Sequence, residues 1–384
     1  MNRILSLLLT GVLLVSAAPA VSAAGTEASP ISLSCASAVL MEKETGTVLF
    51  EQNAHEKLEP ASVTKVMTLL LVMEAVDSGR LSLEDTVTVS AYAASMGGSQ
   101  VYLEEGEQMT VGEMIKCVTV VSGNDCAVAL AEHLAGSETA FVSRMNQRAQ
   151  ELGMKDTTFL NCTGLPAQGH VTSAYDIALM SRELILNHPS IRQYTTIWMD
   201  SIRGGEFGLT NTNRLIRFYP GATGLKTGST DSALYCMSAT AERDGMELIA
   251  VIMKAPTTSQ RFEDAKTLLD YGFANYTLVP VYPDTALAPV EVLLGTSGQV
   301  QPQLQRDCRL LVSKGEESQI STRLTLAENV EAPVDQGQIL GQLEVYVGDE
   351  LRDTVPILSA EGVDRLSVPG IFSRMLSRLL MSEQ

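Results

Sequence analysis

A serine and a lysine, Ser62 and Lys65, have the types and the spacing needed for nucleophilic chemistry. They stand at the start of a long apolar run that predicts a helix, which places the amine one turn after the hydroxyl on the same face. Backbone N–H groups at a helix start favour negative charge on an attacked carbonyl oxygen. A desolvated lysine, with its pKa lowered by a second cation, can accept the serine proton. The pair alone is a weak signal, because it also fits an ordinary helix start.

Two further polar motifs follow this pair. Ser122-Gly123-Asn124 is a polar break between two apolar stretches that are predicted to be helices. Lys226-Thr227-Gly228 comes immediately before a predicted strand that contains Tyr235-Cys236-Met237. Penicillin-binding enzymes carry a helical Ser-x-x-Lys, a loop with serine and asparagine and a Lys-Thr-Gly in this order. Each motif is weak alone, but three in order, each in its expected context, form a specific signal.

Motifs of other enzyme classes are absent from the sequence. Gly97-Gly98-Ser99-Gln100 is followed by Val101, so the chain has no G-x-S-x-G nucleophile elbow. The glycine-rich stretch at 221–227 has Leu225 where a P-loop needs its last glycine. The four histidines are scattered, and no cysteine or histidine pair has the spacing of zinc ligands. We therefore expect no metal site and no cofactor.

The three motifs and their surroundings resemble the serine D-alanyl-D-alanine carboxypeptidases, the low-molecular-mass penicillin-binding proteins. The resemblance covers about residues 30–276, and the C-terminal part is similar to the family's usual second half. The sequence departs from many relatives at Ala233-Leu234-Tyr235-Cys236, where Ala-Gly is common. The family-like segments are 59–68, 121–125, 152–157, 163–165, His170 with Tyr175-Asp176, 223–230 and the helix after Arg261.

The resemblance implies four catalytic residues. Ser62 would be the acylated nucleophile, and Lys65 would be the general base that takes its proton. Ser122 and Lys226 would relay a proton to the leaving D-alanine. The charge of Lys226 would also hold down the pKa of Lys65.

The resemblance also implies a set of substrate-binding residues: Asn124, Thr227, Gly228, Ser229 and Arg261. Asn124 would hydrogen-bond the substrate amide. The backbone N–H groups of Ser62 and Ser229 would form the oxyanion hole. Thr227 and Arg261 would hold the terminal carboxylate, and a charge-assisted contact of this kind would explain the selection of a free chain end.

The implied function is that of a serine hydrolase that removes the C-terminal D-alanine from peptidoglycan stem pentapeptides through an acyl-enzyme, with β-lactam antibiotics as covalent inhibitors. One alternative is a serine β-lactamase, which adds a glutamate that activates water. Glu183 begins a literal E-x-x-L-N sequence, but it lies farther from the second motif than that glutamate does. The other alternative is a catalytically silent cell-wall scaffold, against which the intact Ser62, Lys65 and Lys226 argue.

The elements that must position these residues predict an α/β (α+β) fold. The resemblance implies a penicillin-binding or β-lactamase-like catalytic domain, in which helices flank an antiparallel sheet. Apolar periodicity and turn residues predict a hairpin at 38–51, helices at 63–75, 111–120, 125–134, 138–152, 173–187 and 260–276, and strands at 232–242 and 247–253. After a proline-rich link at 279–283, short strands are expected at 290–294, 308–312, 321–326, 338–347 and 353–358, which indicates a small all-β domain.

The two ends of the chain predict export and membrane attachment. Residues 1–24 have the short basic start, the apolar run and the small-residue exit of a signal peptide. Residues 366–384 predict an amphipathic helix whose polar face carries Arg374 and Arg378, which suits an anionic membrane surface. We expect a protein on the outer face of the cytoplasmic membrane, with its catalytic domain at 25–278 and its all-β domain at 279–365.

The net charge and the positions of the cysteines indicate which binding partners and which cysteine state to expect. The formal net charge is −18, which argues against a nucleic-acid partner because phosphate binding needs a basic face. Several of the six cysteines lie inside apolar helical or strand-like runs, as buried free cysteines do. We therefore favour free thiols over a disulfide framework, although the sequence leaves both open.

Overall fold

The computed structural model describes residues 31–381, so the signal peptide expected at residues 1–24 lies outside the described residues. The residues from Leu33 onward belong to one unit. Helices and a large sheet occupy the first part of this unit, and strands dominate after residue 276. The predicted α/β class, with an all-β C-terminal part, is confirmed.

A five-stranded antiparallel sheet lies at the centre of the first part. Its strands run in the order β2 (Val48–Gln52), β1 (Ser37–Glu42), β9 (Met246–Ala255), β8 (Leu234–Arg243) and β7 (Ala222–Thr230). The two predicted hairpins are therefore present.

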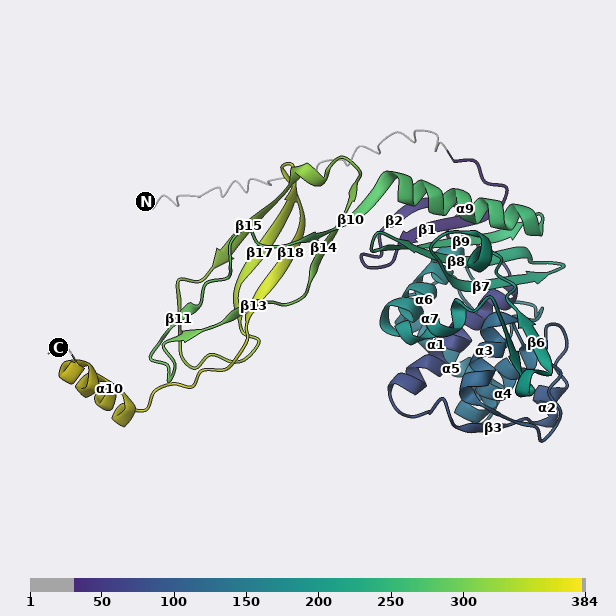
Figure 1. Ribbon diagram of the computed structural model, residues 1–384, viewed down its shortest axis with the longest axis horizontal. Helices are drawn as coiled ribbons and strands as arrows, with labels where there is room; N and C mark the ends of the chain where they lie inside the picture. The colour runs from purple at the N-terminus through teal and green to yellow at the C-terminus, as the bar shows by residue number, and fades with distance from the viewer. Residues whose placement is uncertain (1–30, 382–384) are drawn as a thin grey trace, which may run out of the picture. The chain divides into compact units, whose positions relative to one another are not determined.

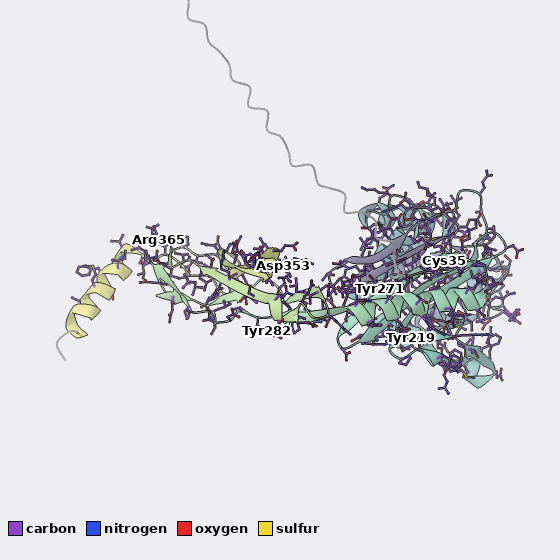
Figure 2. The ribbon with its side chains drawn as sticks, turned by 90° about the horizontal axis from the view of Figure 1, so that it is seen from above. Cys35, Tyr219, Tyr271, Tyr282, Asp353 and Arg365 are labelled. Atoms are coloured by element: carbon purple, nitrogen blue, oxygen red, sulfur yellow. The ribbon has the colours of Figure 1, made fainter. Side chains whose placement is uncertain are left out.

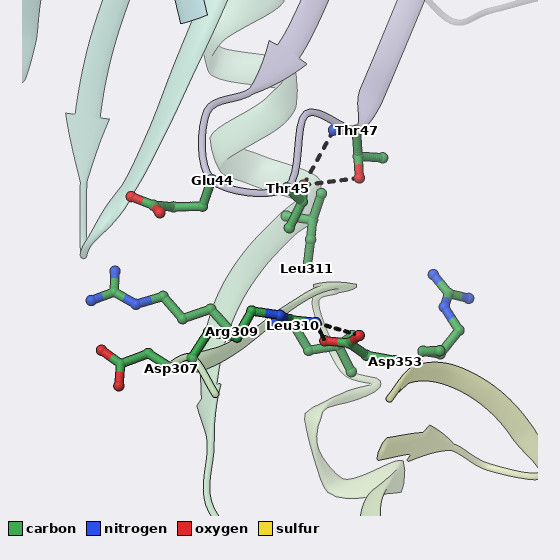
Figure 3. A pocket seen from close by; sticks show the side chains of 10 residues that line it. Glu44, Thr45, Thr47, Asp307, Arg309, Leu310, Leu311 and Asp353 are labelled. Carbon is green, nitrogen blue, oxygen red and sulfur yellow. Dashed lines mark hydrogen bonds and ion pairs between the residues drawn. The ribbon is translucent and has the colours of Figure 1, made fainter. Parts of the chain in front are cut away.

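The hairpin turns explain why these strands pair as they do. Asp244 and Gly245 both have positive φ angles, as the two-residue loop between β8 and β9 requires. In the turn from β1 to β2, the Thr45 hydroxyl donates to the Thr47 hydroxyl at 2.9 Å (Figure 3).

Strand β7 differs from the sequence prediction in a way that matters for the site. The Lys-Thr-Gly motif lies inside this edge strand, and not in a segment before the first strand of a hairpin. Strand β7 has no clear strand pattern in the sequence, because Gly224 and Gly228 are weak strand formers and because Lys226 faces the interior, where an apolar side chain is usual.

Helices cover both faces of the sheet. Side chains alternate along β1, so Val39 and Met41 join the helical core, while Leu40 points toward Gly272 on the opposite side. The helix on that opposite side is α9 (Thr258–Asn275), which lies along β9, β8 and β1 (Figure 1).

Helix α1 (Lys65–Asp77) is the centre of the helical core. A 3₁₀ turn at Ala61–Thr64 precedes it, and nearly all of its side chains are buried, as expected of a helix that is apolar all round. Helices α4 (Asn124–Ala135), α5 (Glu138–Glu151) and α6 (Ala174–Asn187) pack against it. Helix α3 (Val111–Val120) packs on α4, so the Ser122 motif lies between two helices, as predicted.

Several short elements were not predicted, because they lack enough residues for a periodic pattern. They are β3 (Thr86–Thr88), α2 (Ala91–Ala94), β4 (Gln108–Thr110), α7 (Arg192–Thr195), β5 (Met199–Ile202), β6 (Phe207–Thr210), α8 (Leu215–Phe218) and 3₁₀ turns at Pro189–Ile191 and Arg203–Gly205.

The part after α9 is all β, apart from a 3₁₀ turn at Glu317–Gln319 and the last helix. A four-stranded sheet has the order β13 (Pro302–Leu304), β18 (Glu350–Ser359), β17 (Ile339–Val347) and β15 (Ile320–Leu326). Arg306 forms an ion pair of 2.6 Å with Asp353 on β18. The remaining strands are β11 (Val290–Leu293), β12 (Gln299–Val300), β14 (Cys308–Ser313) and β16 (Asn329–Glu331).

The predicted proline-rich link is in fact largely a strand. Strand β10 (Tyr276–Val281) pairs with β14 in a two-stranded sheet, and Pro280 lies within the paired segment. Proline is tolerated there because an edge strand does not need every backbone N–H. Tyr282, directly after this strand, is strongly exposed (Figure 2).

The last described element is helix α10 (Val368–Met381), and the side chains of Arg374 and Arg378 lie outside the described residues. Within residues 31–381, no helix combines the length and apolar character needed to span a bilayer. All six cysteines are buried and free, in agreement with the reading favoured from the sequence.

Candidate active site

The candidate nucleophile lies on the 3₁₀ turn that leads into α1. Ser62 is partly exposed, and the Lys65 side chain one turn later is fully buried. The Lys65 Nζ lies 3.0 Å from the Ser62 Oγ. Ala61 holds a left-handed backbone conformation at φ 48°, which an alanine adopts only where its surroundings enforce it.

Two oxygen atoms determine how the Lys65 amine is oriented. The amine donates to the Asn124 Oδ1 at 2.6 Å and to the Thr163 carbonyl at 2.7 Å. The Asn124 Nδ2 donates to the Gly97 carbonyl at 2.6 Å, which fixes the Asn124 oxygen toward Lys65. A neutral amine has only two N–H bonds, and these two acceptors use both. The lone pair of the neutral amine is then free to accept the proton of the Ser62 hydroxyl.

Burial favours this neutral form. Desolvation lowers the pKa of Lys65 from its usual value to about 7. For Lys226, burial and then the positive charges of Lys65 and Arg261 hold the pKa well below the usual range. The repulsion between the two amines is mutual, so a charge on either one disfavours a charge on the other.

The second motif brings another hydroxyl to Lys226. The Lys226 Nζ donates to the Ser122 Oγ and to the Thr227 carbonyl, both at 2.8 Å. Ser122 is buried and has a φ of 66°, a conformation that costs a serine about 1–2 kcal/mol. This strained residue turns the chain between α3 and α4 and places both Ser122 and Asn124 toward the two lysines.

Strand β7 lies in close contact with the 3₁₀ turn that carries Ser62, the nucleophile turn. A Cβ atom on Gly228 would lie 2.7 Å from the Ser62 backbone nitrogen and 2.9 Å from the Pro60 carbonyl. Only glycine allows so close an approach. Ser229, the next residue, is exposed beside this contact.

The segment that connects β6 and β7 also forms hydrogen bonds with β7. The Thr227 hydroxyl donates to the Thr212 hydroxyl at 2.7 Å, and the Asn213 side chain donates to the Gly224 carbonyl at 2.8 Å. At the end of this connection, the Tyr219 hydroxyl donates to Asp270 on α9 at 2.7 Å (Figure 2). The connection therefore joins β7 to the large helix behind the sheet.

Arg261 on α9 brings a positive charge to the same strand. Its guanidinium donates to the Gly228 carbonyl at 3.2 Å and to the Cys236 carbonyl at 3.4 Å. Burial lowers the pKa of Arg261 to about 10, so the group stays charged. Its Nε is the only buried side-chain nitrogen or oxygen without a hydrogen-bond partner among the described residues. Such a group suits an incoming carboxylate.

His170, which the family resemblance included, supports the nucleophile turn. The Leu160 backbone N–H donates to His170 Nδ1 at 3.1 Å, so the proton of the neutral ring is on Nε2. That Nε2 lies 2.8 Å from the Thr64 hydroxyl, in the turn that carries Ser62. Burial lowers the pKa of His170 to about 4, which keeps the ring neutral.

The structure brings the predicted catalytic residues together as two contacting pairs, Ser62 with Lys65 and Ser122 with Lys226. Asn124 contacts Lys65, and Gly228 lies against both Ser62 and Arg261. Thr227 and Ser229 flank Gly228 on β7.

Thr163 and Thr212 are among the supporting residues for which no role was predicted. Thr163 reaches Lys65 through its backbone carbonyl, which no side-chain pattern reveals. Thr212 lies in an irregular connection and has no motif of its own. For Thr163 a signal did exist, because asparagine shortly before glycine in Asn161–Gly164 is typical of a turn.

The glutamate of the β-lactamase alternative is engaged in other contacts. The Arg148 guanidinium donates to one carboxylate oxygen of Glu183 at 2.5 Å, and the Asn187 side chain donates to the other at 2.9 Å. Glu183 therefore has a structural role on α6, and nothing favours this alternative.

Both parts of the chain are similar to known proteins. Residues 23–257 match the family described as D-alanyl-D-alanine carboxypeptidase, and residues 276–365 match the penicillin-binding protein 5 C-terminal domain. The chain is 42% identical over 372 residues to D-alanyl-D-alanine carboxypeptidase DacF of Bacillus subtilis, with 95% of each chain covered.

Solved structures of penicillin-binding proteins are also similar to this chain. Penicillin-binding protein 5 of Haemophilus influenzae superposes with a TM-score of 0.76 at 29% identity, covering 88% of this chain and 99% of that one. Penicillin-binding protein D2 of Listeria monocytogenes, solved in an ampicillin-bound form, has a TM-score of 0.58 at 34% identity. This second match covers 63% of this chain and 99% of that one.

Proposed function

Since the chain belongs to the serine D-alanyl-D-alanine carboxypeptidases, the low-molecular-mass penicillin-binding proteins, we propose that its reaction proceeds through an acyl-enzyme on Ser62. The enzyme is a serine hydrolase that removes the C-terminal D-alanine from peptidoglycan stem pentapeptides. The observation that carries the proposal is the 3.0 Å contact between the Ser62 hydroxyl and the buried, easily deprotonated Lys65 amine.

In the acylation step, the Ser62 Oγ attacks the carbonyl carbon of the penultimate D-alanine while its proton moves to Lys65. The backbone N–H groups of Ser62 and Ser229 stabilise the oxyanion. As the carbon–nitrogen bond breaks, the proton that Lys65 accepted passes by way of Lys226 and Ser122 to the leaving amine, so that Lys65 is neutral again and free D-alanine departs. Water then attacks the ester, which releases the shortened peptide and restores the Ser62 hydroxyl.

Labelling with a fluorescent penicillin tests the nucleophile. We expect one covalent adduct per chain, which peptide mapping by mass spectrometry should locate on Ser62. An adduct at another residue, or none, would contradict the mechanism. Release of D-alanine from an acyl-D-Ala-D-Ala peptide, with only slow turnover of penicillin, would separate the carboxypeptidase from both alternatives.

The lowered pKa of Lys65 predicts how acylation depends on pH. Its folded-state pKa of about 7 lies below the usual value, so the neutral base predominates above pH 7 and is lost below it. We therefore expect the second-order rate constant of penicillin acylation to fall about tenfold per pH unit on the acid side. Stopped-flow labelling at pH values from about 5 to about 9 measures this. A profile that stays flat through pH 7 would assign the proton to another group.

We further propose that Arg261 binds the terminal carboxylate, with Thr227 beside it, while Asn124 contacts the substrate amide. Replacing Arg261 with alanine should raise the KM for an acyl-D-Ala-D-Ala peptide by about 10- to 100-fold, because a buried charge-assisted contact contributes about 1.5–3 kcal/mol. The C-terminally amidated peptide is the control, since it lacks the charge and should react equally with both proteins. An equal loss with both peptides would indicate a structural role instead.

The ends of the chain complete the proposal. We propose that the protein is exported with removal of residues 1–24, and that the catalytic and all-β parts divide near residue 278. Helix α10 would then hold the protein on the outer face of the cytoplasmic membrane. The support is a set of exposed apolar side chains at the spacing of one helix face: Val368, Phe372, Met375 and Leu376.

Truncation tests the proposed membrane helix. A chain that ends at Asp364 should move from the membrane fraction to the soluble fraction, because it loses the exposed apolar face of α10. The matched control ends at Met381 and retains α10. Both proteins should acylate at the wild-type rate. If the chain ending at Asp364 stays with the membrane, attachment depends on another part.

A further inference from the structure

A tight turn at residues 161–165 contacts Lys65 and the residue before Ser62, although it belongs to none of the three motifs. Its Thr163 carbonyl accepts a hydrogen bond of 2.7 Å from the Lys65 amine. Its Gly164, at φ 82°, packs so closely that a Cβ atom would lie 1.8 Å from the Ala61 carbonyl oxygen. The turn therefore packs closely against the 3₁₀ turn that carries Ser62.

The Asn161 side chain makes most of the hydrogen bonds within this turn. The Asn161 Oδ1 accepts from the Gly164 N–H at 2.7 Å, from the Thr163 N–H at 3.2 Å and from the Thr163 hydroxyl at 3.1 Å. The Asn161 Nδ2 donates to the Leu165 carbonyl at 2.9 Å. Asparagine is suited to this because its short amide can bond to backbone groups two and three residues ahead.

Other residues attach the turn to the protein without setting the direction of the Thr163 carbonyl. The Cys162 N–H donates to the Glu138 carboxylate at 3.0 Å, and the Cys162 carbonyl accepts from the Thr68 hydroxyl at 2.7 Å. These bonds hold the start of the turn on α5 and α1. The two peptide units that follow depend on Asn161 for their orientation.

The Thr163 carbonyl matters because Lys65 must present a lone pair, and not an N–H bond, to Ser62. The neutral amine has two N–H bonds, which point at the oxygens of Thr163 and Asn124. Without the Thr163 carbonyl, the nearest remaining acceptor for the second N–H is the Ser62 oxygen itself. The lone pair would then point away from the proton that it must accept.

We propose that Asn161 is a positioning residue for the proton transfer from Ser62 to Lys65, because it orients the Thr163 carbonyl that fixes the Lys65 amine. This inference rests on the proposed roles of Ser62 and Lys65. It assigns to Asn161 an effect on the acylation step itself, and none on the preceding non-covalent binding.

The experiment measures penicillin acylation at several concentrations, which separates the first-order acylation rate constant from the dissociation constant of the non-covalent complex. Asn161→Ala should lower the rate constant by about 10- to 100-fold and leave the dissociation constant within about twofold. Asn161→Ser should give an intermediate rate, because a serine hydroxyl makes the same turn more weakly. This second variant also provides a result if the alanine variant does not fold.

Asn146→Ala is the matched control. Asn146 on α5 is also partly buried and makes three comparable bonds, two with Phe159 and one with Val142, but it touches neither Thr163 nor Gly164. Its loss should lower the melting temperature and leave the acylation rate constant near the wild-type value.

The outcomes distinguish this inference from the proposed function. A reduced rate constant in the Asn161 variants alone supports the positioning role. Equal rates in wild type and the Asn161 variants, or an equal loss in Asn146→Ala, would overturn it while leaving the Ser62 mechanism intact. Absence of an adduct on Ser62 in the wild type would overturn both.

Discussion

Replacing Lys65 with methionine is expected to slow acylation of Ser62 about 1,000-fold or more. Methionine fills a similar volume but cannot accept the serine proton, and loss of a positioned general base typically costs 10²–10⁴ in rate, as an order of magnitude. Lys226 does not replace it, because its amine is engaged with the Ser122 hydroxyl and the Thr227 carbonyl. The measurement is the first-order rate constant of acylation by a fluorescent penicillin.

Two further variants separate the loss of the base from the loss of its charge. Lys65→Arg keeps a positive charge but stays protonated at every accessible pH, so it should be as inactive as the methionine variant. Lys266→Met removes a partly exposed lysine of α9 that forms an ion pair with Glu263, and it should react like wild type. Substantial acylation by Lys65→Arg would mean that Lys65 acts through its charge, and the general-base role would have to be abandoned.

The parts of the fold that sequence reasoning predicts well are those with a long apolar pattern. Helix α1 is buried on all sides and reads as a continuous apolar run, and the β8–β9 hairpin has the Asp-Gly turn that its geometry requires. Strand β7 lacks such a pattern, because Lys226 and two glycines occupy positions where a strand normally carries β-branched or apolar residues. The part of β7 that lies nearest to Ser62 is therefore the hardest part to predict as a strand from the sequence.

In the candidate site, the catalytic side chains could be predicted from the sequence, whereas the backbone contacts could not. Ser62, Lys65, Ser122, Asn124 and Lys226 could be named from their types and spacing, and the structure brings them into contact. The carbonyls of Thr163 and Gly97 could not be named, because every residue carries a carbonyl and only the folded chain shows where it points. Long-range contacts of this kind leave no local pattern in a single sequence.

A further large effect is expected from adding one methyl group on the edge strand. In Gly228→Ala, the new Cβ would lie 2.7 Å from the Ser62 nitrogen and 2.9 Å from both the Pro60 oxygen and the Val63 nitrogen. All three are backbone atoms, so no rotamer change relieves the overlap, and β7 must move away from the nucleophile turn. We expect acylation to fall about 100-fold, because misplacement of about 1 Å can cost that much.

The matched control is Gly208→Ala. Gly208 also lies in a strand, β6, but a Cβ atom there would meet nothing within 4 Å, so both rate and stability should stay near wild type. Gly228→Ala should lose about 1–3 kcal/mol of unfolding free energy to overpacking, and a folded, penicillin-binding variant that acylates slowly is the expected outcome. If it acylates at the wild-type rate, the close contact between β7 and Ser62 is not required for the oxyanion hole, and the pairing of Ser62 with Ser229 would need to be replaced.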